Sequence, residues 1–136
     1  MEKMQRFIDE WTRDSLGTKP VFRSLYRELE EMNKVTLTWV DRPGISYSLR
    51  ASHENQKDRP LFVMLDVVDD DPDARWLSVC FYGDMVSDPE EFGELIPGGL
   101  LGSDGYCFDI STRDEDLVEY VGTRIREAFE KAGGDT

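Results

Sequence analysis

The spacing of apolar residues changes from a helical to a strand period near residue 34. Before that point, apolar side chains from Met4 to Trp11 recur at i, i+3, i+4 and i+7, which is one face of a short helix. A longer stripe of the same period predicts a second helix over about 19–33, with Thr18 as its N-cap. The sequence therefore predicts two amphipathic helices at the start of the chain.

The next part of the chain has the period of two that is typical of β-strands. Apolar and polar residues alternate over 35–39 and 45–51, and the Asp-Arg-Pro-Gly sequence between these segments favours a reverse turn. Two apolar runs follow, 61–68 and 75–82, joined by an aspartate-rich turn. We expect four strands in two antiparallel hairpins, with the second hairpin at the centre of the sheet.

The last third of the chain combines helix and strand signals. Ser87, followed three residues later by Glu90, matches a capping box and predicts a short helix that ends at Pro97. A glycine-rich loop over 98–105 then leads into a fifth strand at 106–110.

The final element is predicted to be a long helix. Thr112 is its expected N-cap, with Glu115 completing a second capping box. Its apolar face extends to Ala132, and Gly133 and Gly134 provide the stop signal.

This order of elements predicts a single α+β domain over residues 1–136. We expect a mostly antiparallel sheet of about five strands, with the N-terminal helices and the long C-terminal helix packed on one face. In element order, the chain resembles the small frataxin-like and YjbR-like domains. The resemblance concerns architecture only and implies no site or activity, because no residue motif accompanies it.

The acidic charge of the chain is concentrated in its second part. The net charge is −13; residues 1–60 hold 11 Lys/Arg and 10 Asp/Glu, whereas residues 61–136 hold 5 and 19. Such a surface repels phosphate, which argues against nucleic acid as a partner, and it attracts cations or a basic protein. An acidic surface that serves only solubility is the alternative.

The cellular location is predicted from what the sequence lacks. The first residues contain no apolar targeting segment, and the longest apolar run, 61–65, is far shorter than the ~20 residues of a membrane span. Only two cysteines are present. These features predict a cytoplasmic protein without a membrane partner.

The aspartates around the central turn are the first candidate for chemistry. Several carboxylates close together could bind Ca²⁺ or Mg²⁺, although the spacing does not match an EF-hand loop. The alternative is a solvated hairpin tip that discourages aggregation. The candidate residues are Asp66, Asp69, Asp70, Asp71 and Asp73.

Cysteine and histidine chemistry receives less support. Cys80 and Cys107 lie far apart in the sequence and are expected to be buried, unreactive thiols. If their two strands pair, the thiols become neighbours that could be oxidised. His53 lies in a polar loop, where we expect it to be exposed. The sequence predicts no zinc site, no nucleophile elbow and no cofactor.

The glycine-rich loop contains two leucines, and the sequence allows two roles for them. Leu100 and Leu101 could form an apolar docking site at the tip of the loop. Alternatively, they fold back and cover the core.

We therefore predict a small acidic domain that acts by binding, most favourably a basic protein partner, through residues 61–136. Self-association into a homodimer through a sheet face or edge strand remains an alternative. A second class of function is divalent-cation binding by the aspartates of residues 66–73. A third is an enzyme of unrecognised type, with a pocket lined by Trp39, Tyr47 and Trp76.

Overall fold

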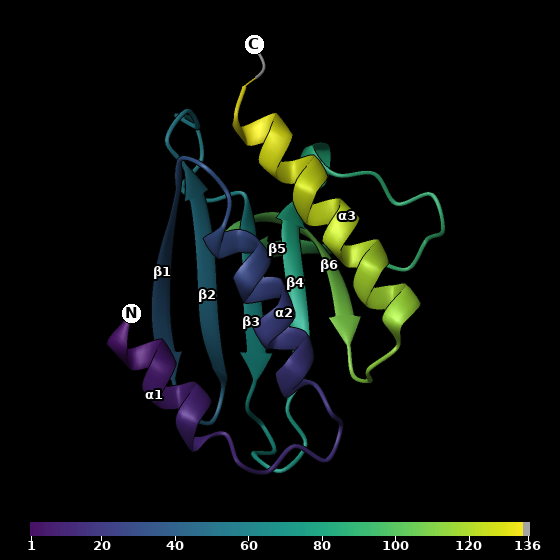
Figure 1. The fold of residues 1–136 in the computed structure, drawn as a ribbon. Helices are drawn as coiled ribbons and strands as arrows, with labels where there is room; N and C mark the ends of the chain where they lie inside the picture. The colour runs from purple at the N-terminus through teal and green to yellow at the C-terminus, as the bar shows by residue number, and fades with distance from the viewer. Residues whose placement is uncertain (135–136) are drawn as a thin grey trace.

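A computed structural model describes residues 1–134 as a single α+β domain. Three helices pack on one face of a six-stranded antiparallel sheet, which confirms the predicted fold class (Figure 1). The helices are α1 (Glu2–Glu10), α2 (Lys19–Glu30) and α3 (Glu115–Ala132). The strands are β1 (Val35–Arg42), β2 (Ser46–His53), β3 (Val63–Val68), β4 (Trp76–Tyr82), β5 (Glu94–Leu100) and β6 (Ser103–Ile110), with a 3₁₀ turn, η1 (Gly83–Met85), after β4.

The sheet order is β1-β2-β3-β4-β6-β5, and every neighbouring pair is antiparallel. The two predicted hairpins are present, and the β3–β4 hairpin occupies the centre of the sheet as expected. After β4 the chain passes outward to β5 and returns as β6, which lies between β4 and β5. As a result, β1 and β5 are the two edge strands.

The period of two along the strands separates the two faces of the sheet. Leu49, Leu65, Val79 and Phe108 face one another in register across four strands, and none of them is exposed to solvent. This row lies beneath the helices and forms the centre of the core. The helices cover it with buried side chains that include Phe22, Leu25, Val121 and Ile125, together with Trp11 directly after α1.

The opposite face of the sheet is mostly polar, although it includes Met64, Trp76 and both cysteines, and it is not covered by a helix of the described residues. Ser48, Asp66, Ser78 and Asp109 form the corresponding row on this face. In Figure 1 the three helices lie in front of the sheet, β6 lies beside β4, and β5 passes behind. We call this surface the uncovered face.

The predicted helix between Ser87 and Pro97 is wrong, because this segment forms a single turn at residues 89–90 and then enters β5. The Asp88 side chain accepts hydrogen bonds from the backbone N–H groups of Phe92 and Gly93 instead of opening a helix. At Gly93 a Cβ atom would lie 2.5 Å from the Tyr106 ring, so glycine allows the chain to lie flat against β6. The sheet consequently has six strands rather than about five.

The N-cap residue of α2 is the predicted one, whereas the N-cap residue of α3 is not. Thr18 stands at the N-cap of α2 without a capping side-chain bond, and Asp14 accepts from the N–H groups of Thr18 and Lys19 at 3.0 Å each. The N-cap of α3 is Asp114 rather than Thr112. At the start of both helices, an aspartate carboxylate satisfies N–H groups that lack a partner within the helix.

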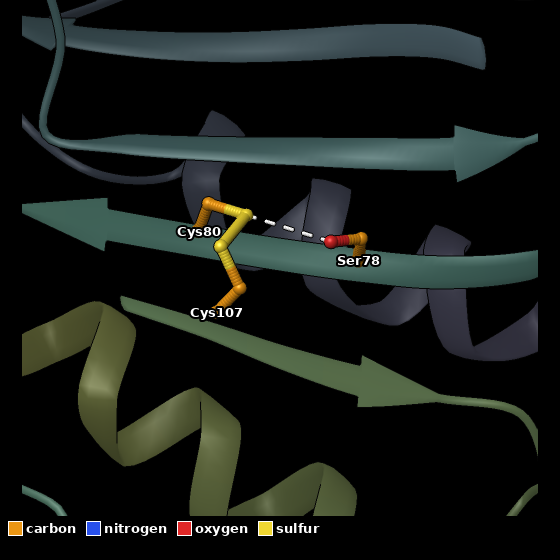
Figure 2. Close-up of a disulfide and its surroundings, with 3 residues drawn as sticks. All are labelled: Ser78, Cys80 and Cys107. Atoms are coloured by element: carbon orange, nitrogen blue, oxygen red, sulfur yellow. Dashed lines mark hydrogen bonds between the residues drawn. A yellow bond between two sulfur atoms is a disulfide. The ribbon is translucent and has the colours of Figure 1, made fainter. Parts of the chain in front are cut away.

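Cys80 and Cys107 form a disulfide across β4 and β6 on the uncovered face (Figure 2). The two residues are direct register partners, with Cα atoms 4.1 Å apart. The expectation of unreactive thiols is therefore wrong, whereas the possibility of neighbouring, oxidised cysteines is confirmed. Disulfides persist in oxidising compartments, so this bond fits secretion rather than the predicted cytoplasm. None of the helices in residues 1–134 is long and apolar enough to cross a membrane.

We expect the disulfide to stabilise the fold. It closes a loop with a sequence separation of 27. Replacing both cysteines by alanine should lower the free energy of unfolding by about 3 kcal/mol, because the unfolded chain regains the entropy of that loop. Urea denaturation with and without a thiol reductant measures the effect. Reductant should destabilise the wild type and leave the double variant unchanged; equal stability of the two oxidised proteins would contradict the prediction.

Candidate functional site

The exposed apolar side chains of the protein gather at one edge of the sheet. Phe92, Leu95 and Leu101 are 52%, 53% and 53% exposed, and Ile96 is 38% exposed. Only two other large apolar residues of the described chain, Met1 and Ile45, are as open to solvent. Exposed apolar side chains that gather along one edge strand make this edge the candidate interaction surface of the protein.

Acidic side chains flank these apolar residues. Glu90, Glu91, Glu94 and Asp104 are all exposed. From residue 76 to residue 112 the chain contains seven acidic residues and no lysine or arginine. We call the combined patch the β5 edge surface; it consists of Phe92, Leu95, Ile96 and Leu101 with Glu90, Glu91, Glu94 and Asp104.

Asp88 positions the segment that leads into β5. Its carboxylate accepts hydrogen bonds from the N–H groups of Phe92 at 3.1 Å and Gly93 at 2.8 Å, and from the hydroxyls of Tyr106 and Tyr120. Burial acts to raise the pKa of Asp88, but these four donors outweigh it and the pKa is lowered. The hydrogen bond to Asp88 in turn raises the pKa of Tyr106 to about 12.

The start of the same segment is fixed to α3. Glu127 accepts hydrogen bonds from the backbone N–H of Ser87 at 2.9 Å and from its hydroxyl at 3.2 Å. Arg124 pairs with Glu127 at 3.3 Å and lies 4.5 Å from the centre of the Tyr120 ring. The segment is thus held at both ends, so that β5 is presented by a rigid support.

The aspartates of the central turn have separate structural partners. Asp69 is buried, pairs with Arg75 at 2.7 Å and accepts from the N–H of Gly44 at 2.9 Å. Asp73 pairs with Arg13 at 3.2 Å, and Asp71 accepts from the backbone N–H of Asp73 at 3.0 Å.

These contacts leave the turn without an assembled metal site. Asp70 is exposed at the turn, and Asp66 lies within β3 on the uncovered face. Within residues 1–134, no group of three or more histidine, cysteine or acidic side chains is placed to hold a metal ion. Cation binding by this turn stays a prediction that the geometry does not favour.

Asp66 is the most deeply buried carboxylate of the uncovered face. It stands in register between Ser48 and Ser78, and one of its carboxylate oxygens has no hydrogen-bond partner. Burial raises its pKa, and the hydrogen bond with Ser48 and the charges of Arg42 and Arg50 only partly offset this effect.

The two leucines of the glycine-rich loop have opposite environments. Leu100 is fully buried, as expected if it covers the core, whereas Leu101 is exposed as expected of a docking residue. They separate because Leu101 and Gly102, with φ of 51° and 90°, form the tight turn between β5 and β6.

The remaining sequence candidates do not form a site. The expectation of an exposed His53 is wrong, since its ring is buried 5.3 Å from Phe129 and its Nδ1 accepts from the N–H of Asn55. Trp39 and Tyr47 face the helices, and strand alternation places Trp76 on the uncovered face. The three aromatic residues therefore do not line a common pocket.

A comparison of the chain with protein-family models, with curated proteins and with solved structures finds no match. The site therefore has to be interpreted from its own residues. Sequence reasoning missed Asp88 and its tyrosine partners, which lie 18 and 32 residues away. The absence of basic residues over 76–112 was the available signal for the β5 edge surface.

Replacing Asp88 by alanine should release the segment before β5. The Asp88 carboxylate accepts four hydrogen bonds, and its removal should destabilise the fold by about 1–2 kcal/mol. Because the folded pKa of Asp88 is lowered, its contribution is present above the unfolded pKa and is lost as the pH falls through the folded value. Urea denaturation at several pH values should show a wild-type advantage at pH 7 that disappears in acid; a constant difference would contradict this account.

Asp66→Asn should stabilise the protein at neutral pH, in contrast to the replacement of Asp88. The raised folded pKa means that the Asp66 carboxylate destabilises the protein at neutral pH, and that this penalty is absent below the ordinary pKa of 3.8. The variant should be more stable than the wild type at pH 7 by about 1 kcal/mol, and the gain should vanish in acid. Thermal unfolding at pH 7 and pH 3 tests this; a less stable variant at pH 7 would show that the charge is compensated.

Proposed function

We propose that this domain binds a basic protein partner through the β5 edge surface. The observation that carries the proposal is the overlap of two features at one place: the gathering of exposed apolar side chains and a 37-residue segment without a single basic residue. Negative potential attracts a cationic partner and accelerates its association, whereas the apolar side chains supply the area that is buried on contact.

The alternative of an acidic surface that serves only solubility accounts for the charges but not for the apolar side chains. A surface that must only stay in solution keeps large apolar groups covered. Here Phe92, Leu95 and Leu101 are all more than half exposed among the carboxylates.

A second copy of the chain is a less suitable partner for the same surface. In a symmetric dimer an interface meets its own copy, so that Glu90, Glu91 and Glu94 would approach other carboxylates. Like charges in contact disfavour such a complex. The disulfide supports an oxidising setting for the encounter with a basic protein.

The proposal predicts salt-sensitive binding of a basic peptide. The probe is a nine-residue synthetic peptide of alternating lysine and valine, followed by amide NMR shifts of the protein. Binding at low salt should change the shifts of residues 88–104 first and should weaken as the ionic strength rises, because salt screens exposed charges. Replacing Glu90, Glu91 and Glu94 by lysine should weaken binding about tenfold, equivalent to about 1.4 kcal/mol.

The matched control is a triple variant with the same change in charge elsewhere, at the exposed Glu31, Glu54 and Asp70. It should retain most of the affinity. An equal loss of affinity in both variants would show that binding depends only on net charge and would contradict the proposed site. An absence of binding at low salt would refute the proposal.

A further inference from the structure

The β5 edge offers backbone groups as well as side chains. Cys80 and Cys107, with Cα atoms 4.1 Å apart, are a pair of the closely spaced type that exchanges no backbone hydrogen bonds. The N–H and C=O of Cys107 therefore point away from β4, toward β5. The backbone N–H and C=O of its register partner Glu94 point inward toward β6, and so do those of Ile96 opposite Gly105. Leu95, between the two, directs its N–H and C=O outward.

We propose that the partner of this domain docks as an added β-strand, in which an extended basic segment pairs with the outward backbone groups of Leu95. This inference rests on the proposed function and specifies its geometry. Addition of a strand to an open sheet edge derives affinity from main-chain hydrogen bonds and specificity from alternate side chains.

The charges on the uncovered face indicate which side of the added strand is basic. Glu94 and Asp109 both lie on that face, and neither forms an ion pair within residues 1–134. Burial raises the pKa of Asp109, and the nearby charge of Glu94 raises it further. A lysine or arginine beside both carboxylates relieves this repulsion.

The other side of the added strand is expected to be apolar. The Leu95 side chain points to the face opposite Glu94, beside its register partner Tyr106, and is half exposed. A segment of alternating basic and apolar residues therefore matches both faces, because successive side chains of a strand point to opposite sides.

The length of the docking strand is limited by its neighbours. The N–H of Gly93 is already bonded to Asp88, and Pro97 has no N–H to donate. The available groups are therefore centred on Leu95. Such a short edge protects against extended sheet aggregation while leaving room for a few main-chain bonds.

The opposite edge of the sheet lacks these features. No large apolar side chain of β1 is exposed, and α1 and α2 both contact this strand. The two edges thus differ in a way that assigns the docking strand to β5.

The test compares two peptides of the same composition, one with alternating lysine and valine and one with all lysines at one end. Strand addition predicts at least tenfold tighter binding of the alternating peptide to the wild-type domain. It also predicts at least tenfold slower hydrogen exchange at the Leu95 amide in the complex. Equal affinity for both peptides, with unchanged exchange at Leu95, would overturn the inference and leave the proposed function standing.

A pair of variants separates the backbone from the side chain. Leu95→Pro removes the outward N–H without breaking a bond to β6, and Leu95→Ala removes only the side chain. The proline variant should bind the alternating peptide at least tenfold more weakly than the alanine variant. If the proline variant does not fold, the exchange measurement on the wild type decides the matter. Failure of the wild type to bind either peptide would overturn both the inference and the proposed function.

Discussion

The pairing of β4 with β6 is the interaction on which the other features of this structure depend. It brings together strands that are separated in the sequence by the whole β5 segment. The same register places Val79 against Phe108 in the core and Cys80 against Cys107 on the uncovered face. A slip of one residue would turn Phe108 to solvent and separate the sulfur atoms, so burial and the covalent bond select the same alignment. The register also determines which backbone groups of β5 face outward.

Asp88 provides the second constraint, because β5 has little core of its own. All of its residues except Leu100 are exposed, so packing alone does not hold the strand in place. Two tyrosine hydroxyls, one from β6 and one from α3, meet the Asp88 carboxylate together with two backbone N–H groups. Charge-assisted hydrogen bonds of this kind are stronger than neutral ones and fix orientation as well as distance. The edge therefore keeps its shape although its side chains remain open to solvent.

The parts of the fold that burial dictates could be predicted from the sequence. Before residue 83, the helical and strand periods identified both helices and the first two strands, and two continuous apolar runs identified the central strands β3 and β4. The strand β5 could not be predicted in this way, because Glu-Leu-Ile-Pro-Gly-Gly-Leu contains one proline and two glycines and follows a plausible helix cap. Its conformation comes from contacts distant in sequence, such as the close fit of Gly93 against Tyr106. In the same way, local charge suggested a joint role for the aspartate turn, whereas Arg75 and Arg13 engage its members separately.

The combination of acidic and apolar groups at one sheet edge has a physical rationale. An open edge with exposed leucine and isoleucine would pair with copies of itself if nothing opposed it. Carboxylates at Glu90, Glu91 and Glu94 oppose that pairing at every encounter between identical chains, and Pro97 interrupts the row of donors. The same carboxylates attract a basic segment, whereas Pro97 limits any added strand to the backbone groups around Leu95. The edge thus repels copies of this chain and attracts basic segments. Both effects are needed for specificity, because the backbone contacts of an added strand are common to all sequences.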